Sequence, residues 1–246
     1  MNVARIRANV LAIDTSTELC SAAVLTRDGE LVLREVLTER SHADLILPMI
    51  DESLAEAGLR LRDLDGLAFG RGPGGFTGLR IAAGVIQGLA YGAGLEVAPV
   101  SSLAAVAFLV TSPATTGEGT DGVLVCNDAR MNELYWACYR VDATAPCRAV
   151  PLTPERVGPA DRVEPLAGVR HFAGNGVARY PELRARLEAA GLRFHDGVFP
   201  RADAIARLGA AMLARGEGVD AAHAVPTYVR DDVARRTTGP AVTGMS

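Results

Sequence analysis

Short apolar runs of strand length open the chain. Val10–Ile13, Cys20–Leu25 and Leu31–Leu37 are three such runs, and the turn at Arg27-Asp28-Gly29 favours a hairpin between the last two. The first run leads directly into Asp14-Thr15-Ser16-Thr17. The pattern therefore predicts a β-meander whose first turn carries an acid and three hydroxyl groups.

A helical spacing of apolar residues follows the meander. Ile46, Ile50 and Leu54 repeat every four residues after Ser41, which is a suitable N-cap, and Pro48 is expected to kink this helix. The elements predicted in this region are a helix over about 42–57, a strand at Leu67–Phe69, a helix over about 77–92, a strand at Glu96–Val100 and a helix beginning at Ser101 or Ser102.

The second half repeats the order of strands, a turn with an acid, and helices. Strands are predicted at Val123–Asn127, Glu133–Val141 and Arg170–Ala173, helices near 181–190 and 201–215, and a Pro-rich connection over 146–165. The Thr-, Gly- and Pro-rich segment Ser112–Gly122 is the predicted domain boundary. The expected division is a lobe over 1–112, a second lobe over 113–231 and a mobile tail over 232–246.

Composition and charge limit the function classes. The chain has 246 residues and a net charge of −4, and all 25 basic residues are Arg. An acidic chain is a poor stand-alone binder of nucleic acid, and the lack of Lys excludes Schiff-base and P-loop lysine mechanisms. Neither a long apolar span nor a signal-peptide pattern occurs, so a cytoplasmic location without membrane contact is expected. The four dispersed Cys are expected to be buried thiols.

The loop over 70–78 nearly matches the frame of a phosphate-binding P-loop. Gly70 and Gly75 have the required spacing, but Phe76 occupies the position of the lysine that meets the phosphates. Free amides at the start of the following helix still leave weak anion binding open. The alternative, which we favour, is a tight strand-to-helix turn in which two backbones approach closely.

Three glycines mark the helix after that loop. Gly84, Gly88 and Gly92 repeat every four residues, and each costs roughly 0.5–1 kcal/mol relative to Ala inside a helix. Such a cost is reasonable only where another backbone comes close. The sequence leaves two alternatives, which are packing on the protein's own sheet and a helix–helix interface with another subunit.

Candidate nucleotide contacts are weak. Asp14 and Thr15 resemble the first phosphate loop of actin-like ATPases, and Gly174 and Gly176 could form a second contacting turn, although an Asx turn explains the first motif equally well. The scattered His residues form no metal-binding pattern, and His42 is expected to be a surface or capping residue. The Asp128-Ala129-Arg130 turn is expected to hold a structural ion pair, so no catalytic residue and no metal ligand is predicted.

Five segments together resemble the bacterial TsaB (YeaZ) family, and they occur in the family's order over nearly the whole chain. The segments are Leu11–Thr17, Ser41-His42 with Leu47-Pro48, Gly70–Ile81, Asp128–Tyr135 and Pro226–Arg230. The block over 70–81 is the most specific. Gly75 departs from the Ser that is usual in the family, which removes a hydroxyl from the loop.

The resemblance implies an α/β fold of two lobes, similar to actin, hexokinase and Hsp70 (the ASKHA fold), with mixed sheets and flanking helices. It also implies a part in making N6-threonylcarbamoyladenosine at position 37 of tRNA. In that process the paralogue TsaD binds metal and transfers the group, TsaC makes the threonylcarbamoyl-adenylate, and TsaE is an ATPase. The metal-binding His-x-x-x-His of TsaD is missing here, because 98–106 contains no His.

The predicted function is therefore a scaffold and activator subunit without activity or a tightly bound cofactor of its own. ATP and metal are expected on partner subunits, with TsaD and TsaE as partners, a homodimer when alone, and tRNA contacted mainly through the complex. The residues chosen for the interface are Leu45, Met49, Ile50, Gly84 and Gly88. The alternatives are an autonomous actin-like ATPase and, less favoured, an M22-type glycoprotease.

Overall fold

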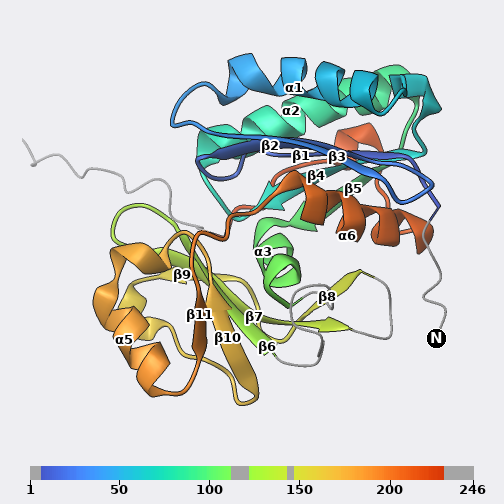
Figure 1. The fold of residues 1–246 in the computed structure, drawn as a ribbon. Helices are drawn as coiled ribbons and strands as arrows, with labels where there is room; N and C mark the ends of the chain where they lie inside the picture. Colours follow the sequence, from blue (N-terminus) through green and yellow to red (C-terminus); the bar gives the residue numbers. More distant parts are fainter. Residues whose placement is uncertain (1–6, 112–121, 143–146, 230–246) are drawn as a thin grey trace, which may run out of the picture.

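The computed structural model describes residues 7–111, 122–142 and 147–229, and it consists of two layered α/β halves (Figure 1). A five-stranded sheet in the order β3-β2-β1-β4-β5 forms the first half. Its elements are β1 (Val10–Asp14), β2 (Leu19–Leu25), β3 (Leu31–Leu37), α1 (His42–Glu56), the 3-10 turn η1 (Leu61–Asp63), β4 (Gly66–Gly72), α2 (Phe76–Ala93), β5 (Val97–Ser101) and α3 (Ser102–Thr111).

A six-stranded sheet forms the second half. Its main order is β11-β10-β6-β7-β8, and β9 pairs with β7 beside that path. Its elements are β6 (Gly122–Asp128), β7 (Leu134–Asp142), β8 (Arg148–Pro151), β9 (Arg156–Gly158), η2 (Ala160–Arg162), β10 (Val169–Ala173), η3 (Val177–Arg179), α5 (Pro181–Ala189) and β11 (Arg193–His195). The chain then continues through α6 (Ala202–Ala214) and η4 (Ala221–His223), which return to the first half.

The two sheets share one topology. In the first, β1 pairs antiparallel with β2 and parallel with β4, while β3 and β5 form the edges. In the second, β6 pairs antiparallel with β7 and parallel with β10, while β8 and β11 take the corresponding edges. This repetition confirms the predicted fold of two α/β lobes with mixed sheets and flanking helices.

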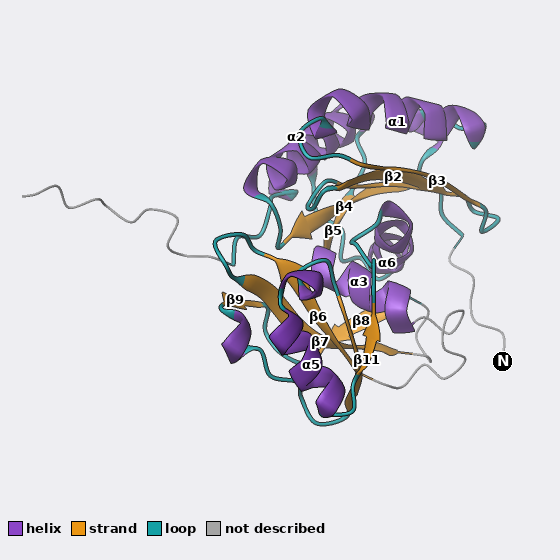
Figure 2. Ribbon diagram, turned by 60° about the vertical axis from the view of Figure 1, so that its left-hand side comes forward, coloured by secondary structure: helices purple, strands orange, loops and turns teal. Residues whose placement is uncertain are grey.

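The core has three apolar layers, of which the one that contains α3 and α6 joins the two halves. Alternation along β1 sends Leu11 and Ile13 toward α1 and α2, and Val10 and Ala12 toward the layer that contains α3 and α6. A third layer lies between the second sheet and α5. Figure 2 shows α1 and α2 on one face of the first sheet, with α3 and α6 between the two sheets.

The helix α6 follows the second sheet in sequence but packs on strands of the first. The predicted boundary segment 112–122 lies almost wholly outside the described residues, as does the tail over 232–246. The division of the chain at 112 therefore stays a prediction.

Several local expectations need correction. Ser41 precedes α1 as expected but makes no side-chain capping bond. The segment predicted as a Pro-rich connection contains the short strands β8 and β9, and the edge strand β11 was also missed. These strands have three or four residues, which is too short for an apolar period to be visible.

Two other expectations concern the thiols and the membrane. Cys20, Cys126 and Cys138 are buried and unpaired as predicted, whereas Cys147 is only partly buried. Within the described ranges, every helix is too short or too polar to cross a membrane.

Candidate functional site

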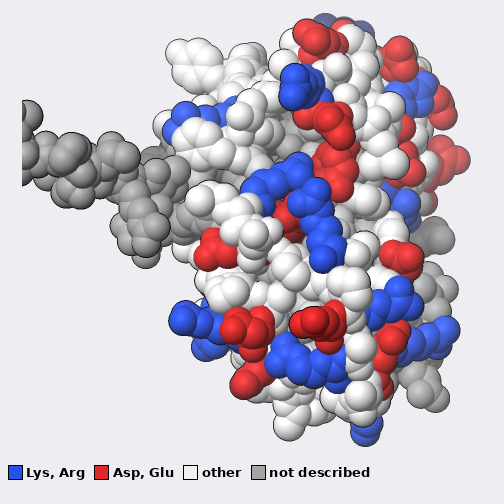
Figure 3. Space-filling model, turned by 90° about the vertical axis from the view of Figure 1, so that its left-hand side faces the viewer, with Lys and Arg blue, Asp and Glu red and all other residues white. Residues whose placement is uncertain are grey.

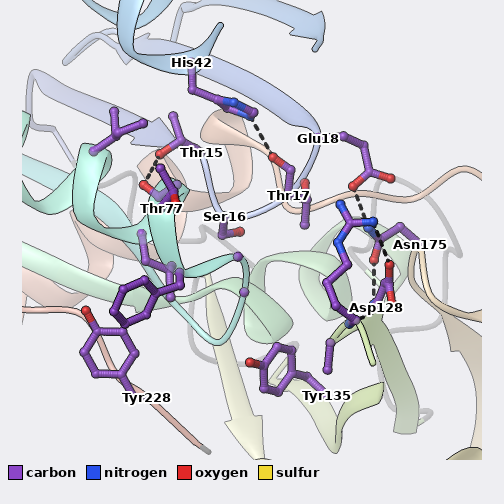
Figure 4. A pocket seen from close by; sticks show the side chains of 18 of the residues that line it. Thr15, Ser16, Thr17, Glu18, His42, Thr77, Asp128, Tyr135, Asn175 and Tyr228 are labelled. Atoms are coloured by element: carbon purple, nitrogen blue, oxygen red, sulfur yellow. Dashed lines mark hydrogen bonds and ion pairs between the residues drawn. The ribbon is translucent and has the colours of Figure 1, made fainter. Parts of the chain in front are cut away.

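A cavity of about 490 Å³ lies where the two halves meet, at the ends of β1 and β6 (Figure 4). Its walls come from the β1–β2 turn, the first turn of α2, the β6–β7 turn and the C-terminal segment over 227–229. Of the residues predicted for nucleotide binding, only Thr15 lines it.

Asp14 does not face this cavity. Its side chain is fully buried, where Oδ1 accepts hydrogen bonds from the Ser16 amide (2.8 Å) and the Ser16 hydroxyl (2.7 Å) and Oδ2 accepts one from the Ser102 hydroxyl (3.2 Å). Burial raises the pKa of Asp14 from 3.8 to about 6, against the lowering effect of these bonds. Both carboxylate oxygens are thus held inside the fold, in an Asx-type turn.

The glycine-rich segment packs directly on the β1–β2 turn. The Gly75 amide donates to the Ser16 carbonyl (2.7 Å), and the Thr15 hydroxyl donates to the Gly78 carbonyl (2.7 Å). A Cβ on Gly74 or Gly78 would overlap the backbone of this turn. The structure therefore matches the close-packed alternative for residues 70–78, in which this segment and the β1–β2 turn approach each other backbone to backbone.

The second predicted turn packs in a similar way on the end of β6. A Cβ on Gly174 (φ +118°) would overlap the Cys126 carbonyl oxygen, and one on Gly176 would lie 2.8 Å from the Asp128 amide nitrogen. Neither glycine lines the cavity. A nucleotide-binding role stays a prediction for Asp14, Thr15, Gly174 and Gly176. The Asp14 carboxylate does not line the cavity.

Asn175, between the two glycines, is the residue that reaches the other half. Its Nδ2 donates to Glu18 Oε2 (3.0 Å), and its Oδ1 accepts from the Asp128 amide (3.1 Å). Figure 4 shows this side chain between Glu18 and Asp128. The sequence places Asn175 in a turn, but the partner lies 157 residues away and could not be predicted.

Asp128 holds an ion pair at the mouth of the cavity. Its Oδ2 lies 3.2 Å from Arg130 Nη1 and 3.0 Å from Arg179 Nη1, which confirms the predicted pair with Arg130 and adds a second partner. On the face drawn in Figure 3, basic and acidic side chains are interspersed. No large patch of one sign covers the face shown, and a mixed surface of this kind gives little attraction for nucleic acid.

A second polar cluster joins the halves beside another cavity, of about 690 Å³. The Glu155 carboxylate accepts hydrogen bonds from the hydroxyls of Tyr139 (2.9 Å) and Ser101 and pairs with Arg71 (3.2 Å). Burial and the neighbouring Glu155 charge raise the pKa of Tyr139. The sequence did not predict this cluster, because its members come from four separate segments of the two halves.

The residues predicted for the interface fall into two groups. Those on α1 face the core, and those on α2 are exposed to solvent. Met49 and Ile50 are 8% and 2% exposed and belong to the core under α1, and Leu45 is partly buried against the same core. Gly84 and Gly88 are exposed on α2, and a Cβ added to either would meet nothing within 4 Å. Packing on the protein's own sheet thus does not explain these glycines.

Metal ligands are scarce in the described part of the chain. There, no group of three or more His, Cys, Asp and Glu side chains is arranged to hold a metal ion. His42 is buried and contacts the Thr17 carbonyl oxygen through Nε2 at 2.8 Å. It links α1 to the β1–β2 turn, and the expectation of a surface position was wrong.

Comparison with known proteins gives a consistent set of matches. A family model described as "TsaD: tRNA N6-adenosine threonylcarbamoyltransferase" matches residues 35–151. The tRNA threonylcarbamoyladenosine biosynthesis protein TsaB of Escherichia coli K12 is 40% identical over 232 residues, which are 92% of this chain and 96% of that protein.

Two further matches agree with these. The TsaB protein of Haemophilus influenzae is 51% identical over 128 residues, 52% of each chain. The solved structure of YeaZ from Pseudomonas aeruginosa has a TM-score of 0.75 and 35% identity, and the match covers 90% of this chain and 99% of that one.

Proposed function

This chain belongs to the TsaB (YeaZ) family of tRNA threonylcarbamoyladenosine biosynthesis proteins, and from that premise we propose that it is a non-catalytic scaffold and activator subunit. The reaction it serves is the formation of N6-threonylcarbamoyladenosine at position 37 of tRNA. The observation that carries this proposal is 40% identity to a named family member along almost the whole length of both chains.

The enclosed carboxylate of Asp14 supports a non-catalytic role. Asp14, the residue that an actin-like ATPase would direct at metal-bound water, is enclosed by Ser16 and Ser102. Gly70 lies against the same carboxylate, because a Cβ added there would overlap Asp14 Oδ2. A nucleotide would have to displace buried contacts of the fold before it reached this carboxylate, so ATP and metal are assigned to partner subunits.

The exposed glycines support a docking surface on α2. Helices approach most closely where small residues line the contact, and Gly84, Gly88 and Gly92 all have open space above them. Leu47 of the neighbouring helix α1 is half-exposed, so its side chain is available for contact with a partner, whereas the side chains of Met49 and Ile50 are buried. The partner proposed for this surface is TsaD, with a homodimer through the same patch when TsaD is absent.

The remaining partners follow from the same role. TsaE is proposed to join the assembly, and tRNA to be held mainly by the complex. Two observations support this division. The chain has a net charge of −4, which gives little electrostatic attraction for phosphate, and the face drawn in Figure 3 carries charges of both signs.

Reconstitution tests the proposal. Cognate TsaC, TsaD and TsaE, tRNA, threonine, bicarbonate and ATP are incubated with and without this chain, and the modified nucleoside is measured by mass spectrometry. Modification that requires this chain, with no activity of the chain alone, is the expected result. Equal modification without it would refute the scaffold role, and magnesium-dependent ATP binding by the isolated chain in calorimetry would then favour the ATPase alternative.

A further inference from the structure

The cavity of about 690 Å³ at the junction of the halves has no part in the proposed function. Its walls come mainly from β4, β5, α3 and α6, which belong to the first half, and from β7, β8 and the segment 153–155 of the second. Small-molecule sites commonly have volumes of about 300–1,000 Å³. The cavity is therefore large enough for a ligand that touches both halves.

Apolar side chains from both halves line this cavity. Val100, Ala104 and Leu208 contribute to it from β5, α3 and α6, and each of them is less than 10% exposed. Ala149 and Pro151 of β8 lie on the side of the second half. Because such a surface stabilises apolar groups that it removes from water, the cavity favours a ligand with an apolar body.

The polar cluster around Glu155 offers this cavity hydrogen-bond donors. The Glu155 carboxylate already accepts from the hydroxyls of Tyr139 and Ser101 and from Arg71 Nη1 (3.2 Å) and Nη2 (3.4 Å). The Nε–H of Arg71 and the second hydrogen of each Nη have no acceptor among the residues that the structure describes. A ligand at this end of the cavity must therefore supply an acceptor.

The charged side chains that line the cavity carry a net positive charge. They are three arginines and two glutamates, namely Arg71, Arg148, Arg215, Glu155 and Glu217. Arg71 pairs with Glu155 (3.2 Å) and Arg215 with Glu217 (2.7 Å), so Arg148 is the cation in excess. The lining thus differs in sign from the chain as a whole, which has a net charge of −4.

We infer that this cavity is a binding site for a small carboxylate with an apolar body. The carboxylate accepts hydrogen bonds from Arg71, whose planar guanidinium suits that group, and Arg148 balances its charge. The body packs on the apolar side chains of β5, α3 and α6. Since the ligand touches both halves, its binding stabilises their arrangement. The site is separate from the α2 surface and does not depend on the proposed function.

The probe is 4-phenylbutyrate, and two compounds are its matched controls. The first, 4-phenylbutyramide, has the same body without the charge, and the second, acetate, has the charge without the body. Binding to the full chain is measured by titration calorimetry. Cys147 lines the cavity and is partly buried, whereas the other three cysteines are buried, so iodoacetamide labelling of Cys147 reports whether the cavity is occupied.

Two variants test the charges. Arg148→Gln removes the excess cation and leaves both glutamates of the lining paired. The double variant Arg71→Gln with Glu155→Gln removes the inner pair without leaving a single buried charge behind. Arg140→Gln is the matched control, because Arg140 is an exposed arginine of β7 that does not line the cavity. Circular dichroism checks that the variants are folded.

We expect 4-phenylbutyrate to bind the wild type, to slow the labelling of Cys147, and to bind about tenfold or more tightly than either control compound. The double variant should bind it about tenfold more weakly, because hydrogen bonds to a charged group are lost. Arg148→Gln should weaken binding by roughly threefold, as for an exposed charge, and Arg140→Gln should leave it unchanged.

No binding of 4-phenylbutyrate, or equal binding of its amide, would overturn the proposal. Binding that leaves the labelling of Cys147 unchanged would overturn it too, because the ligand would then lie elsewhere. The same holds for a folded double variant with the affinity of the wild type. These outcomes are distinct from those of the reconstitution, which tests the scaffold role alone.

Discussion

Two sets of glycines in neighbouring segments serve opposite purposes. Gly74 and Gly78, at the start of α2, lie against the backbone of the β1–β2 turn, where a Cβ would overlap carbonyl oxygens. Gly84 and Gly88 come only a few residues later on the same helix, and a Cβ added to either would meet nothing within 4 Å. The first set is explained by the fold of this chain, and the second is not.

The difference separates structural from functional constraint. A glycine in contact with its own backbone is required for folding, whatever the protein does. A glycine that costs helix stability and contacts nothing among the described residues of its own chain points to contact with another chain. The loop over 70–78, which has the most conspicuous motif in the sequence, thus packs against the protein's own β1–β2 turn, and the helix that follows it carries the proposed interaction.

The largest expected change in the free energy of unfolding is at the glycines that pack on the β1–β2 turn, Gly74 and Gly78. Gly78→Ala places a methyl group on the Thr15 carbonyl oxygen, so the β1–β2 turn and α2 must move apart. We expect a loss of about 3 kcal/mol or more in the free energy of unfolding, as for other substitutions that force backbone displacement. Urea denaturation measures it, and a midpoint equal to that of the wild type would refute the close packing of this junction.

Substitution of Asp14 is expected to stabilise the fold, in contrast to Gly78→Ala. Burial raises its pKa to about 6 in the folded protein, from the value of 3.8 that is usual for an aspartate, so folding favours the protonated form. The stability from this group is complete below pH 3.8 and is lost as the pH rises through 6. At pH 7 the buried carboxylate therefore destabilises the fold, and Asp14→Asn should raise the free energy of unfolding by about 1–3 kcal/mol.

The pH dependence of Asp14→Asn is compared with that of the wild type by thermal unfolding between about pH 4 and pH 7, so that other acids cancel. The gain in the variant should be largest at the upper end of this range and vanish near the usual aspartate pKa of 3.8. A variant that is less stable than the wild type at neutral pH would contradict the assignment of Asp14 as an enclosed acid that the fold does not need in ionised form.

The smallest expected change in the free energy of unfolding is at the exposed glycines, Gly84 and Gly88. Gly88→Ala adds a methyl group to open space on a helix, so the free chain should gain about 0.5–1 kcal/mol of stability. The measurement is urea denaturation at low protein concentration, where self-association is weakest. A loss of stability comparable to that of Gly78→Ala would remove the contrast between the two sets.

Much of the fold could be predicted from the sequence because its signals are local. The four-residue spacing of Ile46, Ile50 and Leu54 predicted α1 within one residue at each end, and the Asp-Gly turn predicted the hairpin of β2 and β3. The same spacing supplied Met49 and Ile50 as interface candidates, although an apolar stripe identifies the core face of a helix. Met49 and Ile50 are buried for that reason, and their part in an interface stays a prediction.

The junction between the halves could not be predicted, because its contacts join distant segments. Arg71 and Glu155 are 84 residues apart, and Glu18 and Asn175 are 157 residues apart. Each is an ordinary polar residue in its local context. Only the arrangement of the two sheets brings these side chains together.

Assembly of Gly88→Leu with TsaD tests the proposed docking surface on α2. Size exclusion with light scattering is run on the wild type and Gly88→Leu, alone and mixed with TsaD, and circular dichroism checks that both chains are folded. We predict a heterodimer with the wild type and none with a folded Gly88→Leu, because a leucine side chain fills the space that a facing helix would need. An unchanged heterodimer with Gly88→Leu would contradict the docking surface.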